Sequence, residues 1–140
     1  MHKKFFFAVL AYFFISFFVA MIWHMVLFHD QYVAMGAFTR SQPLIPFGLA
    51  ALLFQGLVFS YFYPLYYRHK GGGNYLLRGI QFCLFLGLTV YTVMVFATVA
   101  KFQIEPIGQF FVLGTAFQIL QFTLVGIGIG AIYGNCQTSP

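Results

Sequence analysis

The chain has 140 residues, of which 61% are hydrophobic and only 6% are charged, and its mean hydropathy is +0.88. This composition excludes a soluble globular domain, because too few polar residues are present to cover a water-facing exterior. The formal net charge of +5 could indicate a nucleic-acid partner. However, no basic patch is interleaved with exposed aromatic residues, so we expect no nucleic-acid binding.

Four apolar runs divide the chain, and each is long enough to cross a hydrocarbon core of roughly 30 Å, which takes about 20 helical residues. They cover residues 5–28, 44–67, 75–100 and 107–133. The runs are continuously apolar, whereas a membrane strand alternates over about ten residues, so we predict helices. The predicted fold is all-α, with residues 1–140 forming a single polytopic membrane domain, a bundle of four transmembrane helices.

The outer end of the first run carries a group of residues with metal-binding chemistry. Met21, His24 and Met25 fall at i, i+3 and i+4, which places a histidine and two thioethers close together on a helix. Thioether and imidazole ligands suit copper, and His29 could complete a site just beyond the helix end. Two interpretations stay open, a copper site and a belt of amphipathic rings at the membrane interface.

Polar residues inside the runs are few enough to name. Gln55 and Gln118 lie equally far from the start of their runs, which cross in the same direction, so both should sit near the midplane. An amide in hydrocarbon is unfavourable unless it is hydrogen-bonded. We therefore predict a buried polar cluster of Gln55, Thr89, Gln118 and Gln121. The cluster serves either as hydrogen bonding between helices or as a site for a small polar or amphiphilic ligand.

The fourth run has two faces suited to helix packing. Residues that repeat at steps of four and three, the spacing of a packing seam, are Gly114, Gln118, Gln121, Val125 and Gly128. Gly126 and Gly130 form a small-x-x-x-small pair on a neighbouring face, which allows another helix to approach closely. One face would serve the bundle, and the other could serve a second subunit.

Basic residues predict the orientation of the bundle. Those on the predicted inner side are Lys3, Lys4, Arg68, Lys70 and Arg78. The opposite side has Arg40 and Lys101, together with the acidic residues Asp30 and Glu105. Because basic residues accumulate on the cytoplasmic side, both termini should lie in the cytoplasm.

The scarcity of titratable groups argues against catalysis. Only two acidic residues exist, and both are expected outside the membrane, so a general acid/base pair or a proton relay lacks its groups. Cys83 and Cys136 face a reducing compartment and are not expected to form a disulfide. We therefore expect a protein that is not an enzyme.

Three phrases carry a resemblance to a known family: WHMVLFHDQY, PLIPFGLAALLFQGLVFSYFYP and FQILQFTLVGIGIGAIYG. They resemble a family of small bacterial four-helix membrane proteins of unknown function, and the resemblance covers nearly the whole chain. It implies a multi-pass protein of the bacterial inner (cytoplasmic) membrane and no particular activity.

The expected function follows from the second packing face and from an aromatic content of 22%. We expect a non-catalytic accessory or interaction subunit that packs into a homo-oligomer or a larger membrane complex. The alternative is a binder or carrier of a small ligand or of copper, using the midplane glutamines or the outer Met/His group. No other cofactor is expected, and the expected partners are the lipid bilayer and other membrane subunits.

Overall fold

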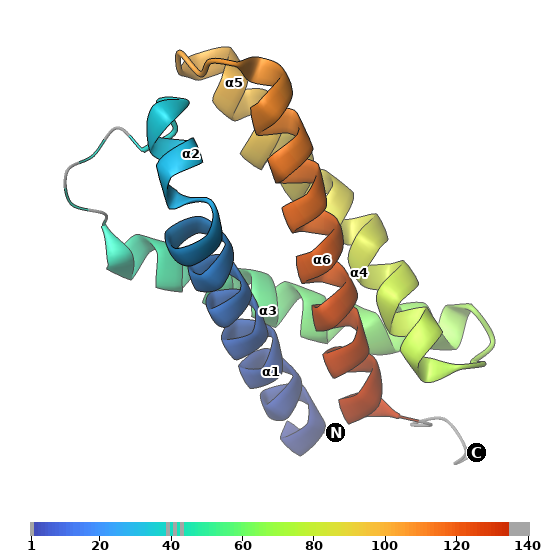
Figure 1. The fold of residues 1–140 in the computed structure, drawn as a ribbon. Coiled ribbons are helices and arrows are strands. Elements are labelled where there is room, and N and C mark those ends of the chain that lie inside the picture. Colours follow the sequence, from blue (N-terminus) through green and yellow to red (C-terminus); the bar gives the residue numbers. More distant parts are fainter. Residues whose placement is uncertain (1, 39, 41, 43, 135–140) are drawn as a thin grey trace.

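The structure is a computed structural model that describes residues 2–38, 40, 42 and 44–134 (Figure 1). Its elements are α1 (His2–Met21), η1 (Ile22–Leu27), α2 (His29–Ala34), α3 (Ile45–His69), α4 (Tyr75–Tyr91), η2 (Thr92–Phe96), α5 (Ala97–Lys101) and α6 (Ile107–Tyr133). Here η1 and η2 are π-helices, and no strand occurs among the described residues. The expectation for Cys136 lies outside this part of the chain.

Four helices are long and apolar enough to cross a membrane. They are Lys3–Leu27, Ile45–His69, Tyr75–Lys101 and Ile107–Tyr133, and each end lies within about two residues of the sequence-based bound. The prediction of an all-helical chain with four long apolar helices is confirmed. The two π-helices, which interrupt the first and third of these helices near one end, were not predicted.

The connection between α3 and α4 marks the end of the bundle that we call the inner end, and the opposite end is the outer end. Gly71, Gly72 and Gly73 follow α3 with backbone φ angles of 69°, 80° and 101°. Residues that carry a side chain rarely adopt such positive φ angles. The Tyr67 hydroxyl donates to the carbonyl oxygen of Gly73 at 2.8 Å and closes this turn. Asn74 then caps α4, because its side chain accepts from two backbone amides of the first helical turn.

Helix α6 is the centre of the bundle, and it packs mainly against α4 and α1 (Figure 1). Its contact with α4 is made backbone to backbone. A Cβ atom placed at Gly79 would meet the carbonyl group of Gly126, and one placed at Gly130 would lie 2.5 Å from the carbonyl oxygen of Tyr75. The Gly126 and Gly130 face, which could have served a second subunit, therefore packs against α4 within the chain.

The other face of α6 is also occupied within the chain. A Cβ atom at Gly128 would lie 2.7 Å from the Ile15 side chain of α1, and one at Gly114 would lie 2.9 Å from the Val95 side chain of η2. Both small-residue faces are thus used to assemble one chain. A second subunit would need a different surface.

Helix α3 belongs to the core over only half of its length. Its buried residues begin at Gly56, where a Cβ atom would lie 3.3 Å from the Tyr12 ring of α1. Residues 45–54, here called the outer half of α3, contain no buried residue, and Phe47 and Phe54 are 74% and 67% exposed. Figure 1 shows the reason, since α3 crosses behind the other long helices at a steep angle.

Two separate clusters form the core. The cluster toward the inner end is the larger and contains Ala8, Tyr12, Phe59, Tyr63, Tyr67, Phe82, Cys83, Phe122, Val125, Ile129 and Tyr133. The cluster at the outer end contains Tyr32, Met35, Val95, Ile104 and Phe110. Buried tyrosines at the inner end keep their hydroxyls bonded, since Tyr63 donates to the carbonyl of Tyr75 and Tyr133 to that of Ser60, at 2.9 and 2.7 Å.

Candidate functional site

Two glutamines lie in the core near the middle of α6. Gln118 and Gln121 are only 8% and 5% exposed, and neither amide forms a hydrogen bond with another described residue. Among the described residues, the fully buried side-chain atoms that lack a hydrogen-bond partner belong to Ser16, His24 and Ser60, so the amide atoms of the two glutamines are not completely enclosed. Gln118 and Gln121 therefore present unused hydrogen-bonding capacity at the edge of the core.

The predicted polar cluster of four residues is divided by the structure. The Tyr12 hydroxyl donates to Oε1 of Gln55 at 2.8 Å, which joins α1 to α3 beside their crossing point. Thr89 is exposed, and its hydroxyl donates to the carbonyl of Leu86 in its own helix at 2.6 Å. Gln118 and Gln121 remain together on α6, while Gln55 has its own partner and Thr89 faces away from the core.

Two buried serines were missed by the sequence reasoning. The hydroxyl oxygens of Ser16 on α1 and Ser60 on α3 are fully buried and have no hydrogen-bond partner among the described residues. Ser16 lies next to Ile15, which packs on Gly128 of α6. Their sequence context could have indicated them, because each is a small polar residue inside a long apolar run.

The outer end of α1 presents an enclosed imidazole. The His24 ring lies 4.7 Å from the Tyr32 ring and 4.5 Å from the Phe117 ring, and its Nδ1 atom is buried without a partner among the described residues. The indole of Trp23 donates to the Tyr32 hydroxyl at 3.3 Å. Burial raises the pKa of that hydroxyl, and the hydrogen bond from Trp23 opposes the rise. The neighbours of the His24 ring are thus the aromatic rings of Tyr32 and Phe117.

The other candidate copper ligands lie in different surroundings. Met21 and Met25 are 40% and 52% exposed, and Nδ1 of His29 lies 3.4 Å from a carboxylate oxygen of Asp30. Within the described part of the chain, no three His, Cys, Asp or Glu residues form a group that could hold a metal ion. The structure thus separates an enclosed His24 from two surface thioethers, and copper binding stays a prediction.

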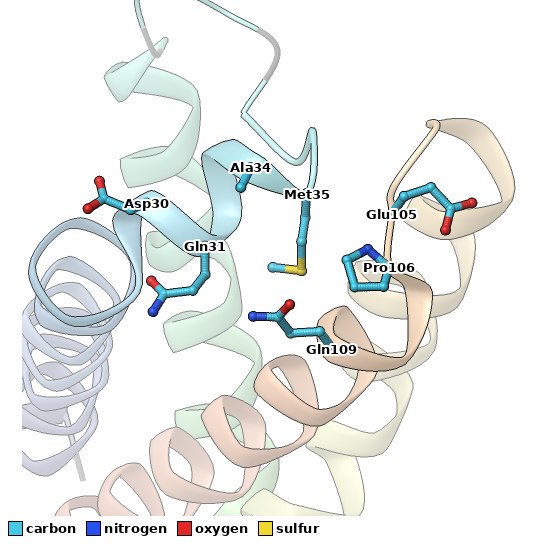
Figure 2. Close-up of a pocket in the computed structure, with 7 residues that line it drawn as sticks. All are labelled: Asp30, Gln31, Ala34, Met35, Glu105, Pro106 and Gln109. Carbon is cyan, nitrogen blue, oxygen red and sulfur yellow. The ribbon is translucent and has the colours of Figure 1, made fainter.

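A cavity of about 320 Å³ opens at the outer end between α2 and the start of α6 (Figure 2). Its lining residues are Asp30, Gln31, Ala34, Met35, Glu105, Pro106 and Gln109. Figure 2 shows the Gln109 side chain extending toward α2 with the Met35 thioether above it, while the Gln31 side chain turns away from Gln109. The backbone amide of Glu105 donates to the carbonyl of Met35 at 3.1 Å, which joins the two walls.

Both acidic residues of the chain line this cavity, although the sequence placed them only on the same side. Their carboxylates do not converge, because Asp30 and Glu105 turn outward on opposite sides of the cavity (Figure 2). General acid/base catalysis needs two such groups directed at one reacting atom. The cavity therefore offers two amides and a thioether to a ligand but no paired carboxylates.

Comparison with family models, curated proteins and solved structures finds no match for the chain. The resemblance to small bacterial membrane proteins stays a prediction. Two features of the protein stand out, the outer half of α3, which contains no fully buried residue, and the glutamines Gln118 and Gln121 of α6, which have no hydrogen-bond partner among the described residues.

Proposed function

We propose that the chain is a four-span protein of the bacterial inner membrane and acts as a non-catalytic accessory subunit. It packs against itself or another membrane subunit through the outer half of α3. The observation that carries this proposal is that none of residues 45–54 is buried in the bundle, and only Leu49 and Leu52 are partly covered. The charge distribution supports an orientation with the inner end in the cytoplasm.

The small residues in the outer half of α3 favour a protein contact over lipid alone. Gly48 and Ala51 share one helix face, and a Cβ atom at Gly48 would meet nothing within 4 Å. By contrast, Gly56 and Gly79 pack closely against neighbouring helices. A glycine inside a helix lowers its stability by about 1 kcal/mol relative to alanine, and small residues in membrane helices allow close approach. Gly48 has no such contact with the described residues.

Cysteine crosslinking in native membranes tests the proposal. Ala51→Cys is introduced together with Cys136→Ser, while the fully buried Cys83 is kept. The matched control is Val93→Cys, which is 64% exposed on η2 toward the outer end. We expect a crosslinked product at position 51, whose mass identifies either a second copy or another subunit. Equal yields at positions 51 and 93 would contradict the proposal.

A second candidate function, binding of a small amphiphilic ligand, is favoured by the unpaired amides of Gln118 and Gln121. A ligand carbonyl or hydroxyl could satisfy these amides, which have no described partner. Native mass spectrometry of protein released from its own membrane would show a retained small molecule. Gln118→Leu should abolish retention, whereas Thr89→Val on the outward face of α4 should not change it.

A further inference from the structure

Charge is divided between the two ends of the molecule. Both acidic residues lie at the outer end, where they line the same cavity. The cations of the inner end are Lys3, Lys4, Arg68, Lys70 and Arg78, and no acidic side chain accompanies them among the described residues. A counter-ion for Arg68, Lys70 and Arg78 would therefore come from outside the described residues.

Arg78 is the cation whose position is held most firmly. Its side chain is half-buried in the first turn of α4. Nε donates to the carbonyl oxygen of Gly72 at 3.1 Å, and Nη1 donates to Oε1 of Gln81 at 3.0 Å. Both acceptors are neutral, and Nη2 forms no hydrogen bond with a described residue. The guanidinium is therefore held in place, and no described residue compensates its charge.

Neighbouring cations add to the field at this turn. Arg68 and Lys70 are exposed at the end of α3, one glycine-rich turn away in the chain. The Lys70 ammonium lies 6.0 Å from the centre of the Tyr66 ring, which directs it back over the helix surface. Two cations thus precede, and Arg78 follows, a turn at which an apolar helix of membrane-spanning length ends.

We infer that Arg78 binds the phosphate of an anionic phospholipid headgroup, with Arg68 and Lys70 at the rim of the site. A guanidinium pairs with phosphate through directed, charge-assisted hydrogen bonds, and a charge at the hydrocarbon edge is unfavourable without such a partner. The three cations favour a lipid with net negative charge over a zwitterionic one. This inference rests on the proposed membrane insertion and is independent of the proposed contact through α3.

Native mass spectrometry on delipidated protein in mild detergent tests this site. Equal concentrations of phosphatidylglycerol and phosphatidylcholine with the same acyl chains are offered together. We expect phosphatidylglycerol to be retained preferentially. Arg78→Gln should lower its affinity by roughly tenfold, the size expected for a lost charge-assisted contact. Arg40→Gln, which removes an exposed cation at the outer end, should leave the affinity unchanged.

Two further variants keep the test decisive where Arg78→Gln fails to fold. Arg78→Lys retains the charge but loses the planar fork, so the preference should persist at reduced affinity. Gln81→Leu keeps the charge and removes one orienting acceptor, so a smaller loss is expected. Equal retention of the two lipids, or an equal loss in Arg40→Gln, would overturn the inference.

Inorganic phosphate distinguishes a lipid site from a general anion site. At the concentrations used for the lipids, phosphate should not displace bound phosphatidylglycerol, and displacement would overturn the assignment to a lipid. A chain that does not fractionate with membranes would instead defeat the proposed membrane insertion. The two failures are therefore distinguishable.

Discussion

The two halves of α3 have similar apolar sequences but opposite surroundings. The inner half, from Gly56 onward, buries Phe59, Tyr63 and Tyr67 in the core, whereas the outer half contains no fully buried residue. The difference arises at Gly56, where the absence of a side chain lets α3 cross α1 at the Tyr12 ring. Hydropathy therefore indicates the length of a helix. The glycines at which two helices come close together decide which part of that helix packs in the core.

The largest effect should come from filling the α4–α6 contact. Gly79→Leu would drive a side chain into the backbone of Gly126, so we expect a loss of about 3 kcal/mol or more, or no folded protein. Gly48→Leu in the outer half of α3 is the matched control, because its Cβ meets nothing within 4 Å. Thermal unfolding in detergent, followed by circular dichroism, measures both. Equal destabilisation would show that the outer half of α3 is packed after all.

A smaller effect is expected at the α1–α3 crossing. Gln55→Leu leaves the Tyr12 hydroxyl without its acceptor, which should lower the free energy of unfolding by roughly 1–2 kcal/mol. Tyr12→Phe in the same background should then cause little further loss, because the hydrogen bond is already absent. Additive losses in this double-mutant cycle would rule out a direct contribution of the bond.

Replacing Gln118 should have less effect still on stability. Its amide has no described partner, so Gln118→Leu should be neutral or slightly stabilising in the purified protein. From the sequence alone, interhelical hydrogen bonding predicted a loss of roughly 0.5–1.5 kcal/mol for this substitution. A loss of that size in unfolding experiments would mean that Gln118 has a partner in the folded protein.

The smallest effect on the stability of the fold is expected from copper binding at the outer end. If Met21, His24, Met25 and His29 hold copper, protein purified without chelators should carry roughly one ion per chain. His24→Ala should abolish it without unfolding the chain. Occupancy should also fall in acid, because only neutral imidazole binds metal. Elemental analysis that finds folded, metal-free protein after exposure to both copper oxidation states would end this hypothesis.

The positions of the helices could be predicted because they depend only on runs of apolar residues. The partner of Gly126 and Gly130 could not, since a small-residue pair serves contacts within a chain and between chains equally well. The grouping of Met21, His24 and Met25 assumed regular α-helical spacing. The π-helix η1 begins at Ile22 and changes that spacing, and nothing in the local sequence signals it.

If the bundle is inserted in a membrane as proposed, the division of charge between its two ends would couple it to the membrane potential. Moving one elementary charge across a potential of 100 mV changes its free energy by about 2.3 kcal/mol. In the proposed orientation the cation-rich inner end, with Arg68, Lys70 and Arg78, occupies the electrically negative compartment. An inverted molecule would carry these cations to the positive side, whereas the outer end would add no net charge, because Arg40 and Lys101 balance Asp30 and Glu105 there. The potential during insertion would thus act as a second determinant of which way the bundle faces, beside the basic residues themselves.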